Sequence, residues 1–269
     1  VDWWDRLWFK KNPNLELVLK REASCFLFPE WSPEDKIFFL EYPYPHYYWE
    51  PDISGTLKVV NIDGSEEKKV INRVWTHFDL SYDGSKLALT NDTVVIIITP
   101  EGEIIDTVFH SEPLVKYVKF AKGDSFLYYY AHGKYIDSSG IYRWNLNTKK
   151  EEFIKFVKKP VSFDIIEDTI IVLGELFSPF AGFSVNPENT NYVTMSKGSD
   201  LILISLSSED TIYLNALPYY RGSVWDPSWD PTGQHIVFSA NEWIAGDPCH
   251  PGPFEIWILR NVLKEGGVQ

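Results

Sequence analysis

The sequence predicts an all-β protein that folds as a single β-propeller. Three observations lead to this prediction: a turn phrase that recurs at roughly blade-length intervals, pairs of short strands after most copies of the phrase, and two chain ends that complement each other. The phrase consists of an apolar strand, a turn rich in Ser, Pro, Asp and Gly, and a second apolar strand. Its copies are Trp31–Phe39, Leu80–Leu89, Phe120–Tyr129, Val185–Met195 and Trp229–Phe238.

The interval between the third and fourth copies is longer than the others and holds one more hairpin. In Val161–Glu175 two short apolar runs flank an acidic turn, and we anchor this hairpin at Asp164. Counting it gives six hairpins. We therefore predict six blades, of which the fourth is degenerate and lacks part of its outer strands, with five blades as the alternative.

A second pair of strands usually follows each hairpin. The clearest pairs have an Asp-Gly, Glu-Gly or Asn-Thr turn between two β-rich runs and are Thr56–Ile71, Val94–Phe109 and Ile141–Ile154. Four strands in each unit of about 40–45 residues match the make-up of propeller blades. No stretch shows a convincing amphipathic helical period.

The two ends of the chain predict a closed ring. Phe254–Asn261 has the pattern of a third strand without a fourth, and Leu15–Glu22 has that of a fourth strand with no blade before it. We infer that the N-terminal strand completes the last blade, which removes exposed sheet edges. Residues 1–14 are then an aromatic N-terminal segment, and residues 15–269 are the propeller. The segment is expected to pack on the side or mouth of the propeller, with a docking segment or interfacial anchor as the alternative.

The turn phrases resemble the repeats of TolB-type propellers, a WD40-like (PD40-type) repeat also seen in the propeller domains of prolyl oligopeptidase-like enzymes. The repeat is roughly an aromatic residue, Ser, Pro, Asp, Gly, Lys and then Ile-Ala-Phe. Tyr82–Ala88 and Asp230–Gly233 match it well, Ser32–Ile37 matches with Gly replaced, and Ala121–Phe126 and Asn186–Asn191 match more loosely. The resemblance covers about Leu15 to Arg260 and implies an architecture. The α/β domain that accompanies the TolB propeller is not expected here, so its cell-envelope role is not transferred.

Composition and charge narrow the classes of partner. The formal net charge of −13 argues against binding to a nucleic-acid backbone and against electrostatic adhesion to anionic membranes. Solubility is the plain explanation of this acidity. No apolar run approaches the ~20 residues that a membrane-spanning helix needs. A chain that starts at Val1 is compatible with a removed leader, so we expect a periplasmic or extracellular protein, with a cytoplasmic one as the alternative.

Blade geometry sorts the connections onto two faces. The turn phrases lie on one face, and the other, the long-loop face, collects Glu41–Gly55, Ala131–Gly140, Gly174–Gly182, Asn215–Asp226 and Ala240–Pro253. Because binding residues concentrate in long loops on a rigid scaffold, we expect the ligand there. The candidate ligand-binding residues are His46, Tyr47, Trp49, Trp75, His77, His110, His132, Tyr220, Arg221, Trp225 and Trp243. Their aromatic rings would stack on a ligand and their polar groups would orient it. The alternative is that they only pack the loops.

These features predict a non-catalytic binding module for a protein, peptide or glycan. The alternative is a propeller enzyme, a lyase or hydrolase acting at the channel mouth, and a third reading is a structural part of a larger assembly. The chain has no GxSxG elbow and no glycine-rich phosphate loop, so no catalytic residue is assigned. No cofactor is predicted. Convergence of at least three of the five loop histidines on one metal ion would favour the enzyme; these histidines are His46, His77, His110, His132 and His250.

Both cysteines are expected on the long-loop face. Cys25 precedes the first blade and Cys249 lies in the last, and these two blades are neighbours in a closed ring. A disulfide across the closure is therefore a candidate, and it would imply an oxidising compartment. Two unrelated free thiols are the alternative.

Overall fold

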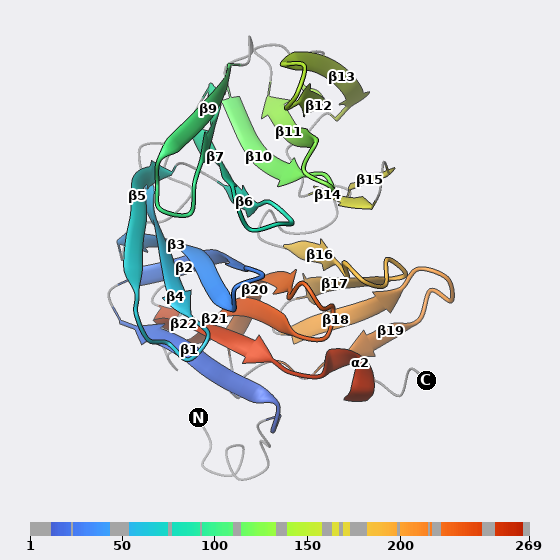
Figure 1. The fold of residues 1–269 in the computed structure, drawn as a ribbon. Coiled ribbons are helices and arrows are strands. Elements are labelled where there is room, and N and C mark those ends of the chain that lie inside the picture. The colour runs from blue at the N-terminus through green and yellow to red at the C-terminus, as the bar shows by residue number, and fades with distance from the viewer. Residues whose placement is uncertain are drawn as a thin grey trace.

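The computed structural model of this chain describes most of its residues. They are residues 12–22, 24–43, 54–74, 77–91, 93–109, 114–132, 139–157, 163–166, 169–172, 182–197, 200–214, 216, 222–243 and 251–265. The strands among them are arranged around a central channel as a β-propeller (Figure 1). No helix among them is long and apolar enough to cross a membrane.

Five antiparallel sheets of four strands form the blades. The first blade consists of β2 (Ser24–Trp31), β3 (Lys36–Pro43), β4 (Gly55–Asn61) and β5 (Lys68–Val74). The second consists of β6 (Phe78–Leu80), β7 (Leu87–Asn91), β8 (Val94–Ile98) and β9 (Ile104–Phe109). The third consists of β10 (Leu114–Phe120), β11 (Phe126–His132), β12 (Gly140–Asn145) and β13 (Lys150–Phe156).

The remaining two blades lie further along the chain. One consists of β16 (Phe183–Val185), β17 (Tyr192–Lys197), β18 (Asp200–Ser205) and β19 (Thr211–Tyr213). The last consists of β20 (Gly222–Trp229), β21 (Ile236–Trp243), β22 (Pro251–Leu259) and β1 (Leu15–Arg21). A short helical turn, α2 (Val262–Glu265), follows β22.

The closure of the ring by the N-terminal strand is confirmed. Strand β1 pairs with β22 in antiparallel register from Leu15 opposite Leu259 to Arg21 opposite Phe254. The last blade therefore takes three strands from the C-terminal part of the chain and its outermost strand from the N-terminal part. The all-β propeller that the turn phrase predicts is confirmed with it.

The extra hairpin forms a separate two-stranded sheet between the third blade and the blade that begins with β16. It consists of β14 (Phe163–Ile166) and β15 (Thr169–Val172). Its predicted anchor is wrong: Ile166 pairs with Thr169, so the connection follows Ile166 and Asp164 lies within β14. The described residues thus form five complete blades, the alternative blade number, together with this smaller sheet.

The turn phrase folds as its chemistry predicts. In the second blade the Asp83 carboxylate accepts a hydrogen bond from the amide of Ser85 at 2.8 Å, and Ser81 N donates to the carbonyl of Lys86 at 2.9 Å. Gly84 has a φ of 72°, in the left-handed region where glycine costs least. Such local bonds fix the position of each inner strand relative to its turn.

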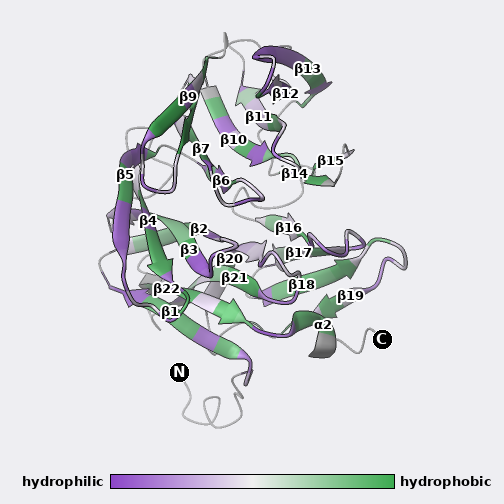
Figure 2. Ribbon diagram, in the orientation of Figure 1, coloured by the Kyte–Doolittle hydropathy of each residue, from purple (hydrophilic) through white to green (hydrophobic). Residues whose placement is uncertain are grey.

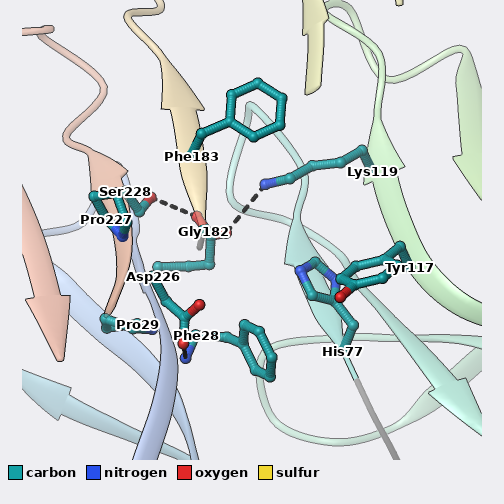
Figure 3. A pocket seen from close by; sticks show the side chains of 11 residues that line it. Phe28, Pro29, His77, Tyr117, Lys119, Gly182, Phe183, Asp226, Pro227 and Ser228 are labelled. Carbon is teal, nitrogen blue, oxygen red and sulfur yellow. Dashed lines mark hydrogen bonds and ion pairs between the residues drawn. The ribbon is translucent and has the colours of Figure 1, made fainter. Parts of the chain in front are cut away.

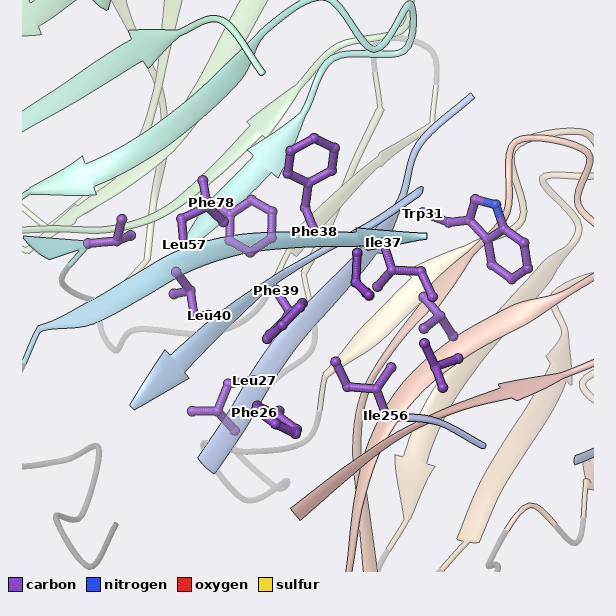
Figure 4. Packing of buried hydrophobic residues seen from close by; sticks show 14 of the residues in the cluster. Phe26, Leu27, Trp31, Ile37, Phe38, Phe39, Leu40, Leu57, Phe78 and Ile256 are labelled. Carbon is purple, nitrogen blue, oxygen red and sulfur yellow. The ribbon is translucent and has the colours of Figure 1, made fainter. Parts of the chain in front are cut away.

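Apolar side chains fill the space between blades. Figure 4 shows one buried cluster, to which the first, second and last blades contribute Phe39, Phe78 and Ile256. The outermost strands β5 and β13 carry long hydrophilic stretches instead (Figure 2), because only one side of an outer strand is covered. Packing of the three inner strands of each blade against neighbouring blades therefore fixes which side chains of the innermost strand point into the channel.

Candidate ligand site in the central channel

Each inner strand contributes one charged or hydroxyl-bearing residue to the lining of a cavity of about 100 Å³ near the turn phrases. In the five blades it stands two positions before the first residue of the turn, and β14 contributes an aspartate. These residues, the channel ring, are Glu30, Asp79, Lys119, Asp164, Ser184 and Ser228. Three acids and one lysine at equivalent positions of the inner strands give this level of the channel a high density of charge.

Lys119 ties the acids of the channel ring together. Its ammonium lies 2.6 Å from Asp79 Oδ1 and 3.1 Å from Glu30 Oε1, and Ser228 Oγ donates to Glu30 Oε2 at 2.6 Å. Burial alone would lower the pKa of Lys119, but the charges of Asp79 and Glu30 outweigh burial and raise that pKa well above its ordinary value. For the acid Asp79 burial has the opposite effect: it raises the pKa to about 7, although the positive charge of Lys119 opposes this shift.

Inner-strand aspartates also join neighbouring sheets. Asp79 Oδ2 accepts the amide of Phe120 at 2.7 Å, and Asp164 Oδ2 accepts the amide of Val185 at 2.8 Å. Asp226 Oδ2 accepts the amide of Phe28 in the same way, at a longer 3.3 Å. Each bond runs from one inner strand to the next, so these acids stabilise the ring from inside.

A second cavity, of about 40 Å³, lies on the other side of the channel ring, toward the long-loop face. Its lining includes the residues two positions before Glu30, Asp79, Lys119, Ser184 and Ser228. These are Phe28, His77, Tyr117, Gly182 and Asp226 (Figure 3), and we call this space the channel-mouth cavity. The His77 ring centroid lies 5.0 Å from that of Phe28 and 5.3 Å from that of Tyr117.

The backbone is bent to present two of these residues. Phe28 and Asp226 have φ values of 52° and 47°, although neither is glycine. Both lie at irregularities in strand pairing, between Leu27 and Glu30 and between Trp225 and Ser228. A β-bulge of this kind redirects a side chain, and left-handed non-glycine residues are concentrated at functional sites.

Two polar groups of the channel-mouth cavity have few hydrogen-bond partners among the described residues. His77 Nδ1 is buried and has no hydrogen-bond partner among the described residues. Burial, and then the charge of Lys119, lowers the pKa of His77 well below its ordinary value, so the ring is neutral at pH 7. Asp226 is half-buried, its carboxylate accepts only the bond from Phe28 among the described residues, and burial raises its pKa to about 7.

Gly182 leaves room for Asp226. A Cβ atom on Gly182 would lie 2.6 Å from Asp226 Cα and 2.8 Å from its Oδ1. Any side chain there would push the two inner strands apart or displace the carboxylate. Glycine is therefore needed for the close approach of β16 to β20.

Of the predicted site residues, the structure places one in this cavity, His77. His132, at the end of β11, is half-buried with its Nδ1 3.1 Å from Ser139 Oγ, and Trp225 stacks on Phe254 at 5.6 Å. Neither lines the channel-mouth cavity. Trp243 belongs to β21, but its side chain lies outside the described part, as do all of His46, Tyr47, Trp49, Trp75, His110, Tyr220 and Arg221.

Cys25 is buried on β2, whereas Cys249 lies outside the described residues, so the disulfide stays a prediction. In the described part of the chain, no group of three or more His, Cys, Asp or Glu side chains is placed to hold a metal ion. Sequence reasoning missed Phe28, Tyr117 and Asp226. The signal that marks them is their fixed offset from each turn.

Comparisons with known proteins return likenesses of architecture. No protein-family model matches the chain, and no curated protein matches its sequence. A chain of a nidogen/laminin complex is 9% identical with a TM-score of 0.42, over 81% of this chain and 75% of that one. TolB from Acinetobacter baumannii is 10% identical with a TM-score of 0.42, over 86% and 54% of the two chains. Hydrazine synthase from Kuenenia stuttgartiensis is 11% identical with a TM-score of 0.40, over 86% and 59%.

Proposed function

We propose that this protein is a non-catalytic binding module for a protein, peptide or glycan. Its ligand docks on the long-loop face and inserts one group into the channel-mouth cavity. The observation that carries the proposal is the pair of under-satisfied polar groups in that cavity, His77 Nδ1 and the Asp226 carboxylate. Buried polar groups without partners destabilise a fold, and a ligand that supplies the missing hydrogen bonds offsets that cost.

The shape of the cavity supports the same role. Phe28 and Tyr117 provide ring surface on either side of His77, and few convergent polar groups among aromatic rings are typical of ligand pockets. A propeller enzyme, a lyase or hydrolase, is the alternative, and convergence of at least three loop histidines on one metal ion would favour it. Of these, His77 and His132 are described and do not line one cavity.

Several finer predictions remain part of this proposal. We keep β14 and β15 as the inner pair of a degenerate sixth blade, since Asp164 takes the same place in the channel ring as Asp79. We also keep a periplasmic or extracellular location, which the Cys25–Cys249 disulfide would favour. Free-thiol titration of the unfolded, unreduced protein tests it: no free thiol supports the disulfide, and two free thiols exclude it.

The binding role is tested with a random peptide library and a glycan array, using the intact protein and two matched tyrosine variants. Tyr117→Leu alters the channel-mouth cavity, and Tyr82→Leu alters the cavity near the turn phrases. Ligands recovered with the intact protein should bind Tyr117→Leu at least about tenfold more weakly, a loss of about 1.4 kcal/mol, and Tyr82→Leu unchanged. The proposal fails if neither library yields a ligand, or if binding depends on Tyr82 alone.

A further inference from the structure

We infer that the channel-mouth cavity recognises a positively charged group, the ammonium of a lysine or the guanidinium of an arginine side chain in a peptide or protein ligand. This inference rests on the proposed binding role and narrows it, because it favours a basic peptide over a glycan. It is argued from charge, from ring geometry and from the size of the cavity.

The charge argument concerns Asp226. Glu30 and Asp79 each pair with Lys119, and Asp164 accepts the amides of Val185 and Ile165. Asp226 has no cationic partner among the described residues and accepts a single 3.3 Å bond from Phe28 N. A half-buried carboxylate without a cationic partner is less favourable than a paired one, so a ligand cation is the partner that this site lacks.

The rings around Asp226 suit a cation as well. Phe28 and Tyr117 present aromatic surface within the same cavity, and aromatic faces attract ammonium and guanidinium groups. With its proton on Nε2, the neutral His77 ring offers Nδ1 as an acceptor for a ligand N–H. An anion would instead meet the carboxylates of Asp226 and Glu30, while Lys119 is already engaged by Asp79 and Glu30.

The cavity is small. Its volume of about 40 Å³ holds only a few water-sized groups, which matches the end of one side chain. The electrostatic field of the whole protein also favours a cationic ligand, because a protein of net charge −13 attracts basic partners and speeds their association.

The test uses small probes of defined charge. Nα-acetyl-lysine methylamide and its arginine counterpart are titrated against the protein, with the norleucine counterpart as the uncharged control, and the His77 ring signals are followed by NMR. The charged probes should shift these signals and bind at least about tenfold more tightly than the norleucine probe. Asp226→Asn should lose at least about tenfold in affinity for the charged probes, while Tyr82→Leu should bind them like the intact protein.

The pH dependence separates Asp226 from its neighbours. The titratable groups around it are Cys25 and Glu30 on β2, Tyr42 on β3, His77, Tyr117 and Lys119. Protons compete with the cation for the carboxylate, so affinity should rise about tenfold from about pH 6 to about pH 8. Asp226→Asn should flatten this profile. A profile that persists in Asp226→Asn would assign it to Asp79 and overturn the role of Asp226.

The outcomes separate this inference from the proposed function. Equal binding of the norleucine and lysine probes, or equal affinity of Asp226→Asn and the intact protein, overturns the cation site. Library ligands that depend on Tyr117 but lack basic residues would leave the binding module intact and remove only the cation site. Charged probes that bind without any library ligand would keep the cation site and remove the proposed macromolecular partner.

Discussion

The two sides of the channel ring are built from the same inner strands but differ in how fully their polar groups are paired. On the turn side, Lys119 lies within 3.1 Å of both Glu30 and Asp79, so the charges are mutually satisfied. On the long-loop side, Asp226 has one long hydrogen bond and His77 Nδ1 has none among the described residues. Satisfied buried charges stabilise a structure, whereas an unsatisfied polar group needs an explanation, which we propose here to be a ligand.

The difference follows from backbone geometry. On the turn side, the offset of two residues from each turn brings Glu30, Asp79 and Lys119 into contact. Two residues further back, bulges at Phe28 and Asp226 interrupt the regular pairing. The same strands therefore form a structural cluster at one level and an open site at the next. Four substitutions test this contrast.

The largest effect is expected for Lys119→Met. Removing the ammonium leaves Asp79 and Glu30 without a cation in a buried place, and breaking such a pair costs about 3–5 kcal/mol of unfolding free energy. Urea denaturation near neutral pH measures it. Adding Asp79→Asn should recover part of the loss. A loss under about 1 kcal/mol would mean that the channel ring is solvated like a surface ion pair.

Gly182→Ala should have the next largest effect. Its Cβ would lie 2.6 Å from Asp226 Cα, and overpacking of this kind typically costs about 1–3 kcal/mol. Thermal and urea unfolding report the loss, and probe binding should weaken with it because Asp226 moves. Gly123→Ala is a matched control for crowding, since a Cβ there meets nothing within 4 Å, although its φ of 87° adds some strain. Unchanged probe binding in Gly182→Ala would show that the site does not need a glycine at position 182.

Asp226→Asn should stabilise the ligand-free protein. The pKa of Asp226 is raised, so its contribution to stability is full below the pKa of the unfolded chain and is lost as pH rises through about 7. The amide can still accept the bond from Phe28 N. We expect a gain of about 1–2 kcal/mol near pH 8 and little change near pH 4, measured as the difference between the two urea curves. A loss of stability near pH 8 would show that Asp226 is structural.

The smallest effect is expected for Ser228→Ala. This change removes the 2.6 Å bond to Glu30 but leaves Glu30 paired with Lys119. Loss of one such bond costs about 0.5–1.5 kcal/mol, and probe binding should change little because Ser228, although it also lines the channel-mouth cavity, is bonded to Glu30. A binding defect larger than the stability defect would mean that the two levels of the channel are coupled.

The sequence allowed most of the architecture to be predicted, because turns and strand pairs are local. The carboxylate of Asp83 and the left-handed Gly84 define a turn from a few neighbouring residues. The extra hairpin lacks such a signal, so its anchor was placed at Asp164, which lies within β14. Ring closure was predictable because the two ends have complementary strand patterns.

The candidate site was predictable only in part. His77 was found because connections could be assigned to faces. Phe28 and Tyr117 lie on strands, where an aromatic residue is ordinarily part of the core, and Asp226 was included only as the end of a loop. The bulges at Phe28 and Asp226 lie where β2 pairs with β3 and β20 pairs with β21, so the alternation of side chains along a regular strand does not predict which way these two residues face.

The pairing of β1 with β22 has a consequence for how the protein is made. Arg260 bonds to Glu16 across 244 residues of sequence, so β1 is synthesised well before its partner strand β22. Every other blade draws its strands from one contiguous stretch and can form as the chain emerges. Until β22 is translated, β1 has no neighbour and is open to mispairing or to a chaperone. Completion of the last blade is therefore a late step that only a chain translated as far as Leu259 can take.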